Sequence, residues 1–110
     1  MTFAIGPLYR SDKYFVPVSA RSEFLNNAQE IHAFLKTQPG FIQGFILEQT
    51  EGSSEFNFVN FTGFENPEAI IHARAAITAL HERTGFDPQG FHTRLGIRAD
   101  VGIYKPTDNL

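Results

Sequence analysis

The chain has 110 residues, a net charge of −3 and a composition that is 42% hydrophobic and 19% charged, which is typical of one globular domain. This balance gives no electrostatic footprint for nucleic acid, and the absence of cysteine excludes disulfides, cysteine nucleophiles and thiolate metal sites. No apolar run approaches the roughly 20 residues of a membrane span, and no signal peptide is evident, so we expect a cytoplasmic protein in which residues 1–110 form a single domain.

The N-terminal region is expected to contain an arm followed by a short strand. Residues 1–12 include Gly6-Pro7 and show no clear hydrophobic period, which favours a loose arm. The stretch "KYFVPV" (13–18) is typical of a short strand that ends at Pro17, because proline cannot donate to a sheet ladder.

A helix is predicted next. Ser19 or Ser22 can cap its N-terminus, and Pro39-Gly40 ends it. Its apolar residues recur at helical spacing and share one face: Phe24, Ala28, Ile31 and Leu35.

A β-hairpin is predicted from two strands, 41–50 and 55–64, joined by a turn at 51–54. A four-residue loop would pair Thr50 with Glu55 and fix the register. One face of the hairpin then carries Phe41, Phe45, Leu47, Phe56, Phe58, Asn60 and Phe64. The opposite face carries Ile42, Ile46, Val59 and Phe61. Both faces of this hairpin are therefore apolar.

The second predicted helix has strong signals at both ends. Asn66 caps it, Pro67 takes the first helical position and Gly85 stops it. A turn is expected at 86–91, and a strand with clean alternation of apolar and polar residues at 93–104.

The predicted order of elements is β-α-β-β-α-β, which indicates an α+β, ferredoxin-like protomer with a four-stranded antiparallel sheet. Two helices cover only one face of such a sheet. An apolar second face of that size usually marks a partner surface, and the simplest partner is a second copy of the chain. We therefore expect a homodimer that forms through the uncovered sheet face.

The stretch 13–104 resembles the antibiotic biosynthesis monooxygenase (ABM) family. The resemblance rests on a helix that runs into "QPGF" (38–41), on a hairpin, and on the third strand "FVNFTGF" (58–64), which is followed by an acidic helix start. It implies a dimeric α+β barrel. The family includes cofactor-free oxygenases that act on quinol-like or polyketide aromatics, and also haem-degrading members.

The resemblance also suggests roles for particular residues. Asn60 matches an asparagine that some cofactor-free members use near the substrate, and Phe64 takes the place usually held by a tryptophan. Ile70 falls where a tyrosine is often found. Arg83 corresponds, with an offset of one residue, to a pocket arginine late in the second helix.

The residue types at these positions allow both functional and structural interpretations. The Asn60 amide can hydrogen-bond a phenol or enolate oxygen, or it can be satisfied by a neighbouring loop. His32 and His81 each lie beside an apolar helical face and can act as a general base or remain boundary residues. Candidate aromatic walls for a substrate, or simple core residues, are Phe45, Phe56, Phe58 and Phe64.

Metal and haem sites have little support in the sequence. No two histidines lie four residues apart on one helix, so we expect no metal site and no cofactor. Haem-degrading members use the strand tryptophan, which is absent, and a histidine in the second helix, for which His72 is the nearest match.

The sequence therefore predicts a cofactor-independent monooxygenase-like enzyme that oxidises a small aromatic or quinol-type substrate with dioxygen. Its catalytic residues would be Asn60 and either His81 or His32, and its substrate-binding residues would be Phe45, Phe56, Phe58, Phe64 and Arg83. The alternative is a non-catalytic ligand-binding or stress-response dimer of the same fold. The expected partners are a second copy of the chain and a small aromatic molecule, with no nucleic acid and no membrane.

Overall fold

A computed structural model describes residues 6–107 of the chain. Its elements are β1 (Leu8–Phe15), a 3-10 turn η1 (Val18–Ala20), α1 (Arg21–Leu35), β2 (Phe41–Glu48), β3 (Phe58–Phe64), α2 (Pro67–Thr84), α3 (Pro88–Leu95) and β4 (Arg98–Tyr104). No helix among these residues is long and apolar enough to cross a bilayer.

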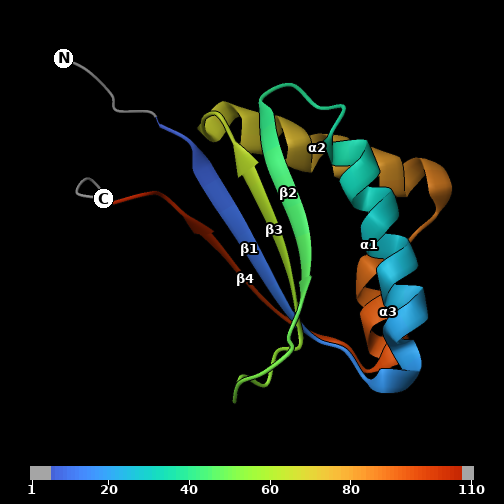
Figure 1. The fold of residues 1–110 in the computed structure, drawn as a ribbon. Coiled ribbons are helices and arrows are strands. Elements are labelled where there is room, and N and C mark those ends of the chain that lie inside the picture. The colour runs from blue at the N-terminus through green and yellow to red at the C-terminus, as the bar shows by residue number, and fades with distance from the viewer. Residues whose placement is uncertain (1–5, 108–110) are drawn as a thin grey trace.

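The strands form one four-stranded sheet in the order β2-β3-β1-β4, and every neighbouring pair is antiparallel. All three helices lie on one side of this sheet and leave its other face bare (Figure 1). The predicted ferredoxin-like α+β arrangement is therefore confirmed for the single chain, with α3 as an added element.

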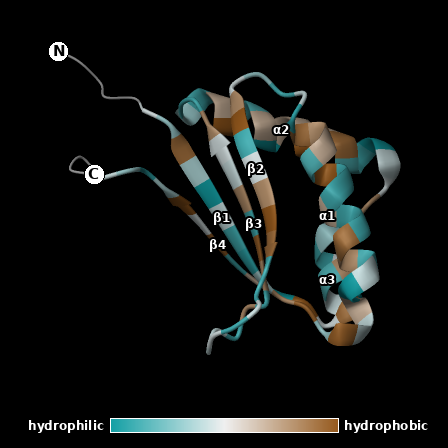
Figure 2. Cartoon of the chain, in the orientation of Figure 1, coloured by the Kyte–Doolittle hydropathy of each residue, from teal (hydrophilic) through white to brown (hydrophobic). Residues whose placement is uncertain are grey.

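The first strand begins earlier than the sequence suggested. β1 runs from Leu8 to Phe15, so it lies partly within the expected arm of residues 1–12; residues 1–5 are outside the described part of the chain. It is a central strand that pairs with both β3 and β4. Figure 2 shows hydrophilic residues along much of β1, which explains why an apolar pattern did not reveal the strand.

The predicted strand at 93–104 was wrong in its first part. Residues Pro88–Leu95 form the helix α3, and only Arg98–Tyr104 form β4. Pro88 takes the first helical turn, and Gly96 ends the helix in the left-handed conformation at φ 73°. These two backbone signals override the alternating pattern, which holds only beyond Gly96.

The two long helices begin in different ways. Neither Ser19 nor Ser22 caps α1, which is entered through η1 from Ala20 without a side-chain cap. The prediction for α2 is confirmed, because Asn66 Oδ1 accepts a hydrogen bond from Ala69 N at 2.9 Å and Gly85 ends the helix at φ 74°.

The hairpin register differs from the prediction by one residue. Phe45 lies opposite Phe61, whereas Phe41 lies opposite Phe64, and the register shifts between Phe41 and Gln43. This irregularity is a bulge that turns Phe45 away from the helices although Phe41 faces them. A side-chain alternation counted from residue 41 therefore assigns the rest of β2 to the wrong face.

β3 also begins later than the predicted residue 55. Just before β3, the backbone of Asn57 still donates to Tyr14 O and accepts from Gln49 N, both at 2.9 Å. Its side chain brackets Val16: Oδ1 accepts from Val16 N at 2.8 Å, and Nδ2 donates to Val16 O at 2.8 Å. This pair of bonds fixes the end of β1 against the start of β3.

The hydrophobic core between sheet and helices is divided into two clusters. The larger contains Val16, Ala20, Phe24, Ala28, Phe58 and Ile97, and the smaller contains Phe64, Ala69, Ile70 and Ala73. Members of both clusters line one cavity, which therefore separates the two parts of the core. The fold therefore leaves a space between the sheet and the helices, where side chains would normally fill the core of a small domain.

Candidate functional site

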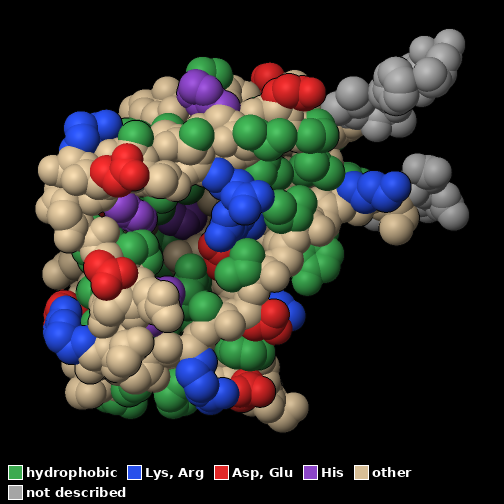
Figure 3. All heavy atoms as spheres, turned by 180° about the vertical axis from the view of Figure 1, so that it is seen from behind, with side chains coloured by type: hydrophobic (Ala, Val, Ile, Leu, Met, Phe, Trp, Pro, Cys, Tyr) green, Lys and Arg blue, Asp and Glu red, His purple; other side chains and the backbone are tan. Residues whose placement is uncertain are grey.

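The cavity has a volume of about 450 Å3 and opens between the sheet and the three helices. Figure 3 shows the opening from behind, with histidine side chains visible in the hollow and charged side chains around it. Its walls come from every layer of the fold: Arg10, Asp12, Tyr14, Phe24, Asn27, Ala28, Ile31, His32, Leu35, Asn60, Thr62, Phe64, Ile70, Ala73, Arg74, Ile77, Thr78, His81, Phe86, Pro88, His92, Ala99 and Val101. The volume is within the range of about 300–1,000 Å3 that small-molecule sites occupy.

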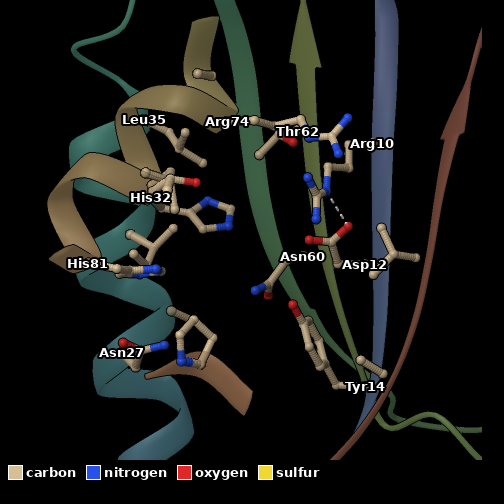
Figure 4. A pocket seen from close by; sticks show the side chains of 18 of the residues that line it. Arg10, Asp12, Tyr14, Asn27, His32, Leu35, Asn60, Thr62, Arg74 and His81 are labelled. Carbon is tan, nitrogen blue, oxygen red and sulfur yellow. Dashed lines mark hydrogen bonds and ion pairs between the residues drawn. The ribbon is translucent and has the colours of Figure 1, made fainter. Parts of the chain in front are cut away.

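The central strand β1 supplies a polar wall. Arg10, Asp12 and Tyr14 are two residues apart, so their side chains share the face that looks toward the helices. Arg10 Nε lies 2.8 Å from Asp12 Oδ1 (Figure 4). Burial and, after it, the Asp12 carboxylate raise the pKa of Tyr14 far above its usual value. Tyr14 therefore stays protonated and can donate a hydrogen bond into the cavity.

Asn60 extends this polar wall onto β3. It lies opposite Asp12 in the sheet, and Figure 4 shows its amide directed into the cavity between Tyr14 and the helices. Its Oδ1 is buried and has no hydrogen-bond partner among the described residues. Because a buried polar atom without a partner costs roughly 1–3 kcal/mol, this arrangement favours a ligand that hydrogen-bonds to the Asn60 amide.

Three histidines face the strands from the helices. His32 comes from α1, His81 from α2 and His92 from α3, and all three line the cavity. Burial lowers the pKa of His32, with a smaller contribution from Lys36, and burial also lowers the pKa of His92. Both are neutral near pH 7 and can accept a proton. His81 Nε2 is the second buried polar atom without a hydrogen-bond partner in the described chain.

The close approach of His32 to the sheet depends on a glycine. A Cβ atom on Gly44 of β2 would lie 3.1 Å from His32 Nδ1 and 3.1 Å from Phe41 Cζ. Any larger residue at position 44 would force the imidazole and the Phe41 ring to shift by a few tenths of an ångström. Gly44 therefore allows His32 to pack closely against β2.

The structure brings together some of the residues proposed from the sequence and separates others. Asn60, Phe64, His32 and His81 line the cavity. Phe58 does not line it, because its side chain is only 1% exposed and fills the larger core cluster.

Three of the proposed substrate-binding residues lie elsewhere. The bulge in β2 turns Phe45 to the open face of the sheet, where its side chain is 49% exposed. Phe56 precedes β3 in the loop, so it does not extend the wall of the strand. Arg83 is exposed near the end of α2 and does not line the cavity.

Several cavity residues were missed by the sequence analysis: Arg10, Asp12, Tyr14, Asn27, Thr62, Arg74 and His92. The available signal was the period-two spacing of Arg10, Asp12 and Tyr14, but strands are normally recognised by an apolar inward face. His92 was placed at the beginning of a strand because a turn was predicted at 86–91 with a strand directly after it, whereas Pro88–Leu95 form α3.

A metal centre finds no support in the described residues. No group of three histidines, aspartates or glutamates in residues 6–107 is placed to hold an ion. His72, the nearest match to the histidine of haem-degrading proteins, is exposed on α2 and lies outside the cavity. Among the described residues, the polar groups that line the cavity are amide, hydroxyl, phenol, imidazole and guanidinium groups, and the one carboxylate among them, that of Asp12, is paired with Arg10. This set suits an organic ligand with polar substituents.

Comparisons with known proteins identify the fold. No family model matches the chain, and no curated protein matches it. Among solved structures, it is similar to a candidate monooxygenase from Shewanella loihica PV-4, with a TM-score of 0.72 and 11% identity over 97% of this chain and 100% of the other. SnoaB, a cofactor-independent oxygenase from Streptomyces nogalater, gives a TM-score of 0.66 and 19% identity over 96% of this chain and 97% of SnoaB.

A third similar structure carries the name of the family itself. It is a candidate antibiotic biosynthesis monooxygenase from Nitrosomonas europaea, with a TM-score of 0.71 and 13% identity over 96% of this chain and 95% of the other. At these identities the likeness concerns the fold and does not transfer an activity. The chain therefore has the fold of the antibiotic biosynthesis monooxygenase-type proteins, as the resemblance in its sequence predicts.

Proposed function

We propose that the chain is a cofactor-independent monooxygenase-like enzyme that oxidises a small aromatic or quinol-type substrate with dioxygen. The observation that carries this proposal is the 450 Å3 cavity, two of whose lining residues, Asn60 and His81, each hold a buried polar atom (Oδ1 and Nε2) without a hydrogen-bond partner among the described residues. A phenolic hydroxyl satisfies both groups when it donates to a His81 Nε2 that carries the lone pair and accepts from the Asn60 amide, whose oxygen and nitrogen exchange places by rotation of the amide.

In the proposed reaction, a base removes the hydroxyl proton of the substrate and leaves an electron-rich anion. The anion passes an electron to dioxygen, and recombination of the two radicals forms a carbon–oxygen bond. Cleavage of the O–O bond leaves one oxygen atom as a ring carbonyl and releases the other as water. The water takes up the hydroxyl proton and the displaced ring proton, so the substrate supplies all the electrons and no external reductant is needed.

The cavity residues divide these tasks. The Asn60 Nδ2 and the protonated Tyr14 hydroxyl donate hydrogen bonds to the developing anion, which lowers the free energy of the charged intermediate. His81 or His32 accepts the proton. The apolar walls formed by residues such as Phe64 and Ile77 exclude water from the anion and hold the ring.

The proposal is tested by oxygen consumption. We expect a panel of naphthols and hydroquinones, each corrected for its rate without protein, to include a compound that the protein oxidises with uptake of dioxygen. With ¹⁸O₂, a single labelled atom should enter the ring carbonyl of the quinone. Compounds that bind without any oxygen uptake across the panel would overturn the proposal.

Binding without oxygen uptake would favour the second candidate function, a non-catalytic ligand-binding dimer. It is favoured by two positions where the chain departs from the cofactor-free oxygenases that it resembles: Phe64 stands in place of the tryptophan and Ile70 near that of the tyrosine. Both side chains are buried in the smaller core cluster.

We also propose that the chain forms a homodimer through the open face of its sheet. An aromatic and aliphatic patch covers this face, and we call it the open-face patch: Tyr9, Phe45, Leu47, Phe61 and Tyr104. Phe61 stacks between Tyr9 and Phe45, with ring centroids 5.4 Å and 6.4 Å apart. About half of the Phe45, Leu47 and Tyr104 side chains remains exposed in the single chain. A contiguous apolar surface of this kind favours a partner, and a two-fold pair of sheets covers both copies.

Analytical ultracentrifugation checks the dimer. We expect the wild-type protein to sediment as a dimer at micromolar concentration and a Leu47→Asp variant to sediment as a monomer, because a charge on the patch would be buried without a partner. Ile71→Asp is the control, since Ile71 is 65% exposed on α2, away from the sheet. A monomeric wild-type protein, or equal behaviour of the two variants, would refute this interface.

A further inference from the structure

One end of the cavity carries more positive charge than its neighbours neutralise. Arg10 and Arg74 both line the cavity, and Figure 4 shows their guanidinium groups directed toward the same end, beside Thr62. The ion pair of Arg10 with Asp12 accounts for one of the two positive charges. The neutral form of His32 adds none, so an excess positive charge remains at this end.

Arg74 differs from most other arginines of the chain. Arg21, Arg94 and Arg98 each form an ion pair at 2.7 Å with a glutamate at the protein surface. Arg74 is also solvent-exposed where it lines the cavity, but within residues 6–107 it has no such acidic partner. It stands on α2 two turns before His81, so both side chains project from the same side of the helix toward the cavity.

We infer that the cavity binds an aromatic ligand that carries a carboxylate, and that Arg10 and Arg74 hold this carboxylate. The planar guanidinium group matches a carboxylate with paired hydrogen bonds, and such charge-assisted bonds are about twice as strong as neutral ones. Two guanidinium groups facing one region also repel each other, and an anion between them removes that repulsion.

The sheet register sets the distance between the carboxylate and the reacting end of the ligand. Arg10 lies opposite Thr62, and Asp12 lies opposite Asn60, so the two levels are two residues apart. This spacing is roughly 7 Å at about 3.3 Å per residue. A hydroxylated aromatic acid with its two polar groups at opposite ends of the ring system spans such a distance. The carboxylate would then lie near Arg74 and the hydroxyl near Asn60.

This inference rests on the proposed function, because it names the class of substrate for the same cavity: a hydroxylated aromatic carboxylate. It goes beyond that function in assigning a specificity element, the pair Arg10 and Arg74. A binding measurement tests the carboxylate site separately from the proposed function. It compares two aromatic hydroxyl compounds that differ only in whether they carry the negative charge.

Isothermal titration calorimetry with three matched compounds provides the test: 6-hydroxy-2-naphthoate, its methyl ester and 2-naphthol. We expect the acid to bind at least about tenfold more tightly than the ester, which corresponds to about 1.4 kcal/mol. Its affinity should fall as salt rises from low to physiological concentration, while that of 2-naphthol should not. Equal affinities of acid and ester would overturn the carboxylate site and leave the proposed function standing.

Two variants of α2 locate the effect. Arg74→Gln should lose most of the preference for the acid and leave the affinity for 2-naphthol unchanged. Arg83→Gln is the matched control, because it removes the same charge from the same helix outside the cavity. If both variants lose the preference equally, the effect is the net charge of the protein and the site is refuted. If none of the compounds binds, the inference fails, and oxygen uptake with neutral hydroquinones decides the proposed function separately.

Discussion

Replacing Phe58 by alanine is expected to lower the free energy of unfolding by about 3–5 kcal/mol, the typical cost of truncating a buried aromatic side chain. Phe58 begins β3 and is only 1% exposed. Its ring packs against that of Phe24 with centroids 5.0 Å apart, which joins the sheet to α1. The larger core cluster already borders the cavity. Few apolar side chains are therefore available to move into the space that the phenyl ring would leave.

Urea denaturation at several protein concentrations measures this effect, because a dimer would make the stability depend on concentration. Ile71→Ala is the control: Ile71 is apolar like Phe58 but 65% exposed, and its truncation should change the stability by no more than about 0.5 kcal/mol. A loss below about 1.5 kcal/mol for Phe58→Ala would mean that this cluster does not hold sheet and helix together.

The elements that the sequence predicted well are those with local signals in the backbone. Asn66, Pro67 and Gly85 define α2 because each residue type favours one particular conformation or hydrogen bond at a helix end. The sheet topology followed from the same elements, since a chain of this length has few ways to cover one sheet with two helices.

The face assignments of the hairpin could be predicted only in part. Asn60 and Phe64 were predicted to share a face because the period of two is reliable within an unbroken strand, and the resemblance to the family placed that face toward the helices. Phe45 was placed wrongly, because the bulge after Phe41 depends on how β2 fits the twist of the sheet and leaves no clear mark in the composition. One extra residue was enough to move the predicted ring from the cavity to the open-face patch.

The polar half of the site was hidden for a different reason. Arg10, Asp12 and Tyr14 lie on a central strand whose inward face is polar, which is unfavourable unless the groups satisfy each other or a ligand. A prediction from apolar periodicity therefore does not recognise β1 as a strand. In this chain the strand without an apolar inward face is the one that lines the cavity. Such departures from the usual sequence pattern are expected at functional sites.

The second large effect concerns catalysis. Asn60→Ala is expected to lower the turnover number by roughly 100-fold, the lower end of the loss seen when one donor to a developing oxyanion is removed. The free energy of unfolding should change by less than about 1 kcal/mol, because Asn60 Oδ1 has no hydrogen-bond partner among the described residues and its removal breaks no bond within the protein. Oxygen uptake with the best substrate of the panel and urea denaturation measure the two quantities.

Asn57→Ala is the matched control for this variant. Asn57 lies three residues earlier and makes two hydrogen bonds of 2.8 Å to the backbone of Val16, but it does not line the cavity. Its replacement should lower the stability by roughly 1–3 kcal/mol, because Val16 is only 2% exposed and its backbone groups lose their partners. Below the unfolding transition, the turnover number of this control should remain close to that of the wild type. If Asn60→Ala instead lowers the stability and leaves turnover and ligand binding unchanged, Asn60 is a structural residue and the proposed reaction loses its main hydrogen-bond donor.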